Sequence, residues 1–131
     1  MASELKLSNT IFCKNFAIKS TSNTQLLDMR VAEARVEKIH ISNMIDRERQ
    51  AVLMLKIGEV NSILGTFLIP ANAGKVSTVP AVELCSLLPI SQIDQAGNYF
   101  INLPLNASLH IQFSGGETHD YNVTILGAYY D

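Results

Sequence analysis

The sequence contains no tryptophan, only two cysteines and four prolines, and no large excess of charge of either sign. Ten basic residues against twelve acidic residues give a net charge of −2. Such a balance produces no positive surface that would hold a polyanion, so nucleic acid is not expected as a partner. No apolar stretch reaches the roughly 18 residues of a membrane span, and no signal-peptide pattern opens the chain. We therefore expect a protein that is made in the cytoplasm and has no membrane partner.

Cysteine is too scarce for a disulfide framework or for a thiolate metal site. Cys13 and Cys85 stand in unrelated contexts, and a single bridge would not make a framework. A zinc site would need more soft ligands close together. We expect two free thiols that are buried as small apolar side chains, with no metal and no cofactor.

The densest apolar alternation in the chain lies between Arg49 and Pro70. One uninterrupted apolar row precedes the turn signals at 58–61, and a second row follows them. Two such rows joined by a short connection predict a β-hairpin whose apolar face must be covered by another sheet. The first row consists of Ala51, Leu53, Leu55 and Ile57, and the second consists of Ile63, Gly65, Phe67 and Ile69.

The length of 131 residues and the hydrophobic content of 47% fit one domain. Residues 1–10 alternate only weakly and are expected to form an N-terminal arm or edge strand, so the domain is expected to span 11–131. Alternation is cleanest at 105–113 and returns at 121–125, with turn residues between the two segments. About seven or eight short strands separated by turns predict an all-β fold, an antiparallel β-sandwich of jelly-roll type.

Two segments depart from simple strand patterns. Ser22 and Gln25 form a possible capping box before a stretch of roughly helical spacing, but the same stretch also suits a strand that continues toward residue 43. The β-rich surroundings favour the strand. Pro80 and Pro89 bracket the other segment, which predicts one short helical turn near residues 81–88.

The order of these segments carries a resemblance. The chain runs through V-E-K-I-H-I-S-N, a charged turn, A-V-L-M-L-K-I, F-L-I-P-A-N-A-G and N-Y-F-I-N-L-P-L-N-A-S-L-H-I-Q-F, and then Y-N-V-T-I-L-G-A-Y-Y. Over residues 34–131 this order resembles small β-sandwich structural proteins of bacteriophage particles. Two features depart from it: Asn106-Ala107 stands where such proteins usually carry Gly-Asp, and the segment from Val82 to Leu88 is an insertion.

The resemblance implies a virion component that works by its position and not by catalysis. It would be a decoration, tail-associated or minor capsid protein, assembled in the host cytoplasm as symmetric copies on a larger particle. Its partners would be copies of itself and other virion structural proteins.

Apolar residues also lie on the faces opposite the two rows of the predicted hairpin. A strand with both faces apolar is covered on both sides, and the cover would be the helical turn, the N-terminal segment or another subunit. The terminal tyrosines either belong to an interface, where aromatic residues are enriched, or to an edge strand within the domain. The predicted oligomer interface consists of Val52, Met54, Leu64, Leu68, Tyr129 and Tyr130.

A polar loop near the C-terminus suggests an alternative function, a carbohydrate- or receptor-binding module. His119 and Asp120 follow Gly115-Gly116, but adjacent side chains point to opposite faces of an extended loop, which disfavours a shared metal. The predicted ligand patch consists of Asn98, Glu117, His119, Asp120 and Tyr121.

No residue pattern predicts catalysis. Ser114 lacks the G-x-S-x-G turn of a nucleophile elbow, and neither cysteine has neighbours that would activate a thiolate. His40 and His110 lie on the polar sides of predicted strands, where they are either solvent-exposed or close enough across a sheet to act as a protonation switch. We expect a protein that is not an enzyme.

Overall fold

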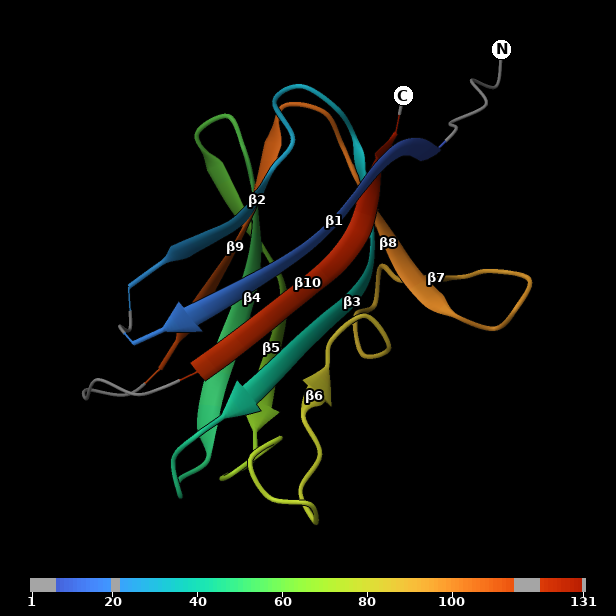
Figure 1. Cartoon of the computed structure of the whole chain (residues 1–131). Coiled ribbons are helices and arrows are strands. Elements are labelled where there is room, and N and C mark those ends of the chain that lie inside the picture. The colour runs from blue at the N-terminus through green and yellow to red at the C-terminus, as the bar shows by residue number, and fades with distance from the viewer. Residues whose placement is uncertain (1–6, 20–21, 115–120, 131) are drawn as a thin grey trace.

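The structure is a computed structural model that describes residues 7–19, 22–114 and 121–130, and these residues form two antiparallel β-sheets (Figure 1). No helix occurs in the described ranges. The predicted all-β antiparallel sandwich is thereby confirmed, while the jelly-roll type stays a prediction. The strands are β1 (Leu7–Ile18), β2 (Thr24–Asp28), β3 (Ala34–Asn43), β4 (Arg49–Ile57), β5 (Val60–Ile69), β6 (Val82–Glu83), β7 (Gln92–Ile93), β8 (Tyr99–Leu103), β9 (Ala107–Phe113) and β10 (Tyr121–Tyr130).

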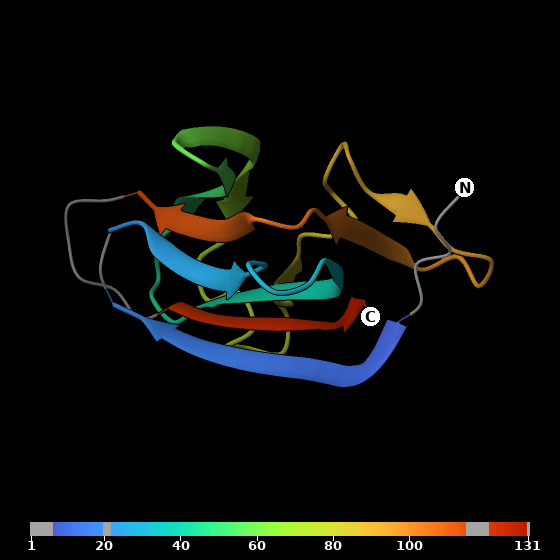
Figure 2. The ribbon, with the colours of Figure 1, turned by 90° about the horizontal axis from the view of Figure 1, so that it is seen from above.

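The two sheets differ in strand number and order. The first sheet has the order β1-β10-β3-β8-β7, with β6 also paired to β3, and the second sheet has the order β2-β9-β4-β5. In Figure 1, β1, β10 and β3 lie in front of β9, β4 and β5, and Figure 2 shows the same strands from above. The expected domain boundary at residue 11 falls inside β1, which continues as the edge strand of the first sheet.

The hydrophobic core lies between the sheets and is built from the alternate residues of each strand. The rings of Phe113 from β9 and Tyr121 from β10 stack with centroids 3.8 Å apart, which joins the second sheet to the first. The predicted inward positions at 107–113 and 121–125 are confirmed, because their side chains are buried, but Leu105, which was expected on the same side, is 44% exposed. The core includes Val36, Ile39, Ile41, Ala51, Leu53, Leu109, Ile111, Val123 and Ile125.

The predicted hairpin is confirmed as β4 and β5, but β5 contains an irregularity that alternation alone does not reveal. Leu53 pairs with Gly65 and Met54 pairs with Ile63, so Leu64 is an extra residue. Because a bulge shifts the side-chain phase by one residue, Leu64 packs against the core and Ile63 turns outward. The expectation that Ile63 faces the core and Leu64 faces away from it was therefore wrong.

The predicted helical turn at 81–88 is also wrong. Val82 and Glu83 form strand β6 on β3, and a hydrogen-bonded turn from Leu84 to Leu87 follows. The Glu83 carboxylate accepts hydrogen bonds from the backbone N–H groups of Ile39, Cys85 and Ser86. The N–H groups of Cys85 and Ser86 would also need acceptors at the start of a helix, and here the Glu83 carboxylate provides them. Its hydrogen bond from Ile39 holds the segment against β3.

Residues 24–28 form strand β2, which confirms the choice of strand over helix. The strand does not continue to residue 43, because residues 29–33 lead from the second sheet to β3 of the first.

The two thiols are free, but only one is buried: Cys13 is exposed on β1 and Cys85 lies in the core. Burial raises the pKa of Cys85 to about 12. The expectation of a buried Cys13 was wrong, because β1 is an edge strand with a solvated outer face.

Candidate functional site on the outer face of the second sheet

The outer face of the second sheet brings two kinds of surface together. In an antiparallel pair, residues directly opposite each other share a face. The register places His110 between Gln25 and Met54, and it places Ser108 between Asp28 and Lys56. The part of the face over β2 and β9 is therefore polar, while the part over β4 and β5 is largely apolar.

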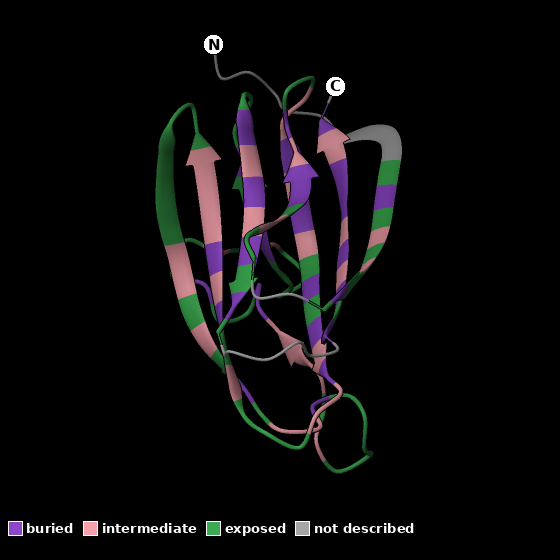
Figure 3. Cartoon of the chain, turned by 90° about the vertical axis from the view of Figure 1, so that its left-hand side faces the viewer, coloured by how far each residue is buried: buried purple, intermediate pink, exposed green. Residues whose placement is uncertain are grey.

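The apolar strip is the group of outward apolar side chains on β4 and β5, namely Val52, Met54, Ile63 and Leu68. Ile63 is 67% exposed and Leu68 is 62% exposed. Both belong to β5, an edge strand that contains no charged residue. Figure 3 shows exposed and half-buried residues along this strand at one margin of the molecule. Natural edge strands commonly carry charge, so an uncharged strand with exposed apolar residues indicates a contact surface.

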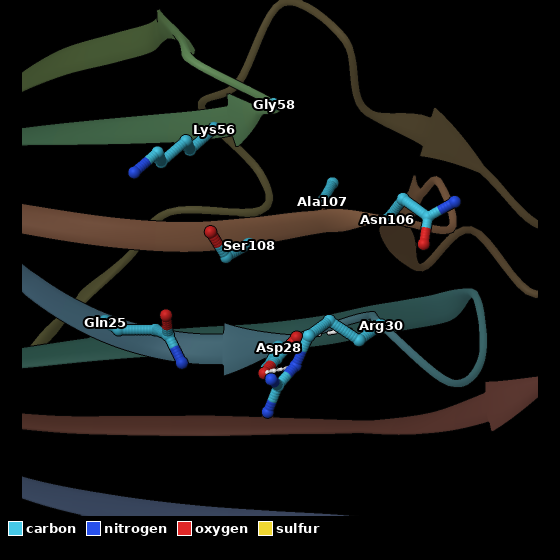
Figure 4. A pocket seen from close by; sticks show the side chains of 8 residues that line it. All are labelled: Gln25, Asp28, Arg30, Lys56, Gly58, Asn106, Ala107 and Ser108. Atoms are coloured by element: carbon cyan, nitrogen blue, oxygen red, sulfur yellow. Dashed lines mark hydrogen bonds and ion pairs between the residues drawn. The ribbon is translucent and has the colours of Figure 1, made fainter.

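The polar groove lies at the other end of the same face and has a volume of about 400 Å³. It runs between the ends of β2 and β4 and the start of β9 (Figure 4). Asp28 forms an ion pair with Arg30 at 2.7 Å, and it also accepts a hydrogen bond from the Arg30 backbone N–H. Asn106 enters the groove from a turn with a φ of 63°, a left-handed conformation that asparagine tolerates. The groove is lined by Gln25, Asp28, Arg30, Lys56, Gly58, Asn106, Ala107 and Ser108.

A hydrogen-bonded chain of three side chains lies between the strip and the groove. His110 Nε2 is 2.7 Å from Ser108 Oγ, and His110 Nδ1 is 2.7 Å from Asn23 Oδ1. Desolvation lowers the pKa of His110 below its ordinary value, and the positive charge of Lys56 lowers it further. The imidazole is therefore held in its neutral form near pH 7.

The residues of the predicted oligomer interface are distributed over the whole molecule. Leu68 is exposed in the apolar strip, whereas Leu64 packs against the core. Tyr129 packs against Phe12 with ring centroids 5.0 Å apart, and Tyr130 is 8% exposed and donates a hydrogen bond to Asn102. Val52 and Met54 are half-buried in the strip. The three residues that share one surface are therefore Val52, Met54 and Leu68, and Ile63 joins them because of the bulge.

The predicted ligand patch is not assembled from the two of its residues that the structure describes. Asn98 lies in the turn between β7 and β8, and β8 pairs with the part of β3 that begins at Ala34. Tyr121 pairs with Asn43 at the other end of β3, and it is 1% exposed. Glu117, His119 and Asp120 lie outside the described residues. The prediction grouped these residues as one polar and aromatic patch, and the topology separates Asn98 from Tyr121.

The two strand histidines do not form a pair. His40 lies on β3 of the first sheet and His110 on β9 of the second, and both side chains are on outer faces. The core therefore lies between them. Sequence alternation already placed Ser108 and His110 on one face, but Asn23 is distant in the chain and only the pairing of β2 with β9 brings it near.

Among the described residues, no cluster of three or more His, Cys, Asp or Glu side chains has the arrangement of a metal site. The same residues contain no helix long and apolar enough to cross a bilayer. No protein-family model matches the chain, and no curated protein is significantly similar to it in sequence.

Proposed function

We propose that this protein is a structural building block that acts by associating with copies of itself, as a decoration, minor capsid or tail-associated component of a phage or virus-like particle. The observation that carries the proposal is the apolar strip, whose exposed members Ile63 and Leu68 lie on the uncharged edge strand β5. The order of segments over residues 34–131, which resembles small phage structural proteins, supplies the particle context.

A second copy of this chain is the partner that suits the strip. When a two-fold axis brings identical surfaces together, a charged side chain close to the axis meets its own copy and is repelled. The strip avoids this penalty because Val52, Met54, Ile63 and Leu68 are all uncharged. The bulge at Leu64 interrupts the edge ladder, so the contact uses the face of the strip more than the backbone edge of β5.

The size of the strip indicates how strongly two copies associate. Burying Ile63 and Leu68 from both copies contributes about 6–12 kcal/mol, at about 1.5–3 kcal/mol per side chain. Association costs about 4–15 kcal/mol in lost freedom. One such contact is therefore weak, and a stable assembly needs further contacts made by the same copies on a larger particle. This is the behaviour of a component that assembles on a shell.

Sedimentation velocity over a range of concentrations tests the association. The parent protein is expected to associate as concentration rises, and Leu68→Lys or Ile63→Lys is expected to weaken association by about tenfold or more. Val31→Lys is the matched control, because Val31 is 95% exposed and lies outside the strip. A strictly monomeric parent protein at all concentrations, or equal effects of the strip and control substitutions, would overturn the proposal.

The particle context needs a separate measurement. Mass spectrometry of particles purified on a density gradient from the source culture is expected to detect this chain in a fixed ratio to the shell protein. Its absence from such particles would contradict the virion role while leaving self-association intact.

The polar groove favours a second candidate function, a carbohydrate-binding module. Its amide, carboxylate and hydroxyl groups can pair with the neighbouring hydroxyls of a sugar. Binding on a glycan array that is lost in Asp28→Ala and Asn106→Ala would support it. Retention of such binding in both variants, or no binding at all, would reject the groove as the site.

A further inference from the structure

The side chains of Ser108, His110 and Asn23 have the mutual distances of a nucleophile, a base and a residue that orients the base. The two hydrogen bonds that link them are both 2.7 Å long. Ser108 also lines the polar groove, so its hydroxyl is next to a space that can hold a small molecule. Catalytic sites of this type are identified by such geometry and not by sequence position.

The hydrogen-bond partners determine the direction of proton donation along this chain. Asn23 Nδ2 donates toward Met54 Sδ, at 3.9 Å, and sulfur can only accept. The oxygen of the Asn23 amide therefore faces His110, whose Nδ1 must donate to it. The other ring nitrogen, Nε2, is left with a lone pair that accepts the proton of the Ser108 hydroxyl. This is the tautomer that a general base requires.

Charged groups around Ser108 are placed on both of its neighbouring strands. Lys56 of β4 is directly opposite Ser108, and Asp28 of β2 is opposite it on the other side. Asp28 is neutralised by Arg30, so the cation of Lys56 dominates the field at the serine. Figure 4 shows the Ser108 hydroxyl on the side of β4, the strand that carries Lys56. A cation in this place stabilises a negative charge that develops on a substrate carbonyl oxygen.

We propose that the polar groove is an ester-cleaving site, with Ser108 as the nucleophile, His110 as the general base and acid, Lys56 as the stabiliser of the oxyanion and Asn23 as a positioning residue. This activity is independent of the self-association proposed above. Nothing in the linear sequence indicates it, because the nucleophile lies near the start of strand β9 and not in a G-x-S-x-G turn.

The reaction needs only the ester and water. Ser108 Oγ forms a bond to the acyl carbon while its proton moves to His110 Nε2, and the carbonyl oxygen becomes the anion beside Lys56. The carbon–oxygen bond to the alcohol then breaks, and the alcohol leaves with the proton from His110. Water attacks the acyl-serine, its proton passes through His110 to Ser108, and the carboxylic acid is released.

The lining of the groove defines the class of substrate. Most of its side chains are polar, with Gln25, Asn106 and the Asp28–Arg30 pair around the serine. An ester of a hydroxylated alcohol would find hydrogen-bond partners there. The volume of about 400 Å³ suits a small molecule, and the described residues that line the groove include no large apolar side chain that would hold a long acyl chain. We therefore infer a short-chain acyl ester of a polyhydroxylated alcohol.

Two measurements on the full chain test the site. The first is hydrolysis of p-nitrophenyl acetate, where Ser108→Ala is expected to reduce the rate to the buffer background and His110→Gln to reduce it about 100-fold or more. The second is labelling with a fluorophosphonate probe, followed by peptide mass mapping. The adduct is expected on Ser108 in the parent protein and is expected to be absent in Ser108→Ala.

Matched controls come from residues of the same type outside the groove. Ser62→Ala on β5 and His40→Gln on β3 are expected to retain both the rate and the label. Asn23→Ala tests positioning, because it is expected to weaken the Nδ1 proton signal of His110 in the nitrogen-15 NMR spectrum as well as the rate. Circular dichroism verifies that each variant is folded. A parent protein that takes no label at Ser108, or a hydrolysis rate that survives Ser108→Ala, would overturn the proposal.

Discussion

The outer faces of the two sheets carry different kinds of side chain. The outer face of the first sheet carries polar side chains on its three long strands, including Asn15, Lys38, His40 and Thr124. The outer face of the second sheet combines a polar groove with an apolar strip on an uncharged edge strand. Both inner faces are covered by one core, so the two sheets differ in what their outer faces present to the solvent.

Glycine substitutions give the largest expected contrast between the two sheets. A Cβ added at Gly127 of β10 would lie 2.1 Å from the Arg35 carbonyl oxygen, and this backbone atom cannot move aside. We expect Gly127→Ala to lower the free energy of unfolding by about 3 kcal/mol or more. A Cβ at Gly65 of β5 would meet the end of the Phe67 ring, which can rotate. Urea denaturation is expected to show a smaller loss of unfolding free energy for Gly65→Ala than for Gly127→Ala. Equal losses would contradict the view that β10 of the first sheet is rigid while the edge strand β5 can adjust.

The second contrast concerns buried and exposed asparagine. Asn43 at the end of β3 is fully buried, and its side chain bonds to the carbonyl groups of Arg47 and Pro70 and to the N–H of Ile45. Asn43→Ala leaves these groups unsatisfied, so we expect a loss of about 2–3 kcal/mol. Asn61→Ala on the exposed part of β5 is the control, with an expected change within about 0.5 kcal/mol. Thermal and urea denaturation of both variants would check the difference.

The bulge in β5 predicts opposite behaviour for two neighbouring residues. Leu64 packs against the core and Ile63 is 67% exposed. We expect Leu64→Ala to cost about 1–2 kcal/mol, because part of its side chain is buried, and Ile63→Ala to change stability by less than about 0.5 kcal/mol. Urea denaturation measures both. If Ile63→Ala lowered stability more than Leu64→Ala, the extra residue of the bulge would not be Leu64, and Ile63 would not belong to the apolar strip.

The smallest expected effect is a pH dependence that comes from His110. Its pKa is lowered in the folded state, mainly by desolvation and then by Lys56, relative to an ordinary value of 6.5. Between the folded pKa and 6.5 the unfolded chain binds more protons, so the free energy of unfolding falls as the pH falls through this range. The contribution is fully present above pH 6.5. Urea denaturation against pH is expected to lose this dependence in His110→Gln and to keep it in His40→Gln.

Alternation predicted the strands well because one face of each strand is buried. The hairpin at β4 and β5, the inward rows of β9 and β10 and the choice of strand at residues 24–28 all follow from a period of two. The helical turn was mispredicted because its proline brackets also fit a β-bridge and a turn held by the Glu83 carboxylate. Proline punctuation cannot distinguish these two structures.

The candidate site was only partly predictable. Val52, Met54 and Leu68 followed from the apolar surplus on the hairpin, but Ile63 was assigned to the wrong face because a bulge leaves no mark in a run of apolar residues. Ser108 and His110 shared a polar face in the sequence. Asn23 and the groove residues Asp28 and Arg30 could not be linked to them, since their proximity depends on which strand lies beside β9.

The amino-acid sequence by itself determined the class of this protein: an apolar residue at every second position can be buried only by pairing strands and stacking sheets. The tertiary structure decided which side chains meet. Strand order and register place residues far apart in the chain on one surface, and a single extra residue in β5 determines which side chain of that strand faces the solvent. Local patterns cannot specify such neighbours, because they depend on long-range pairing between strands.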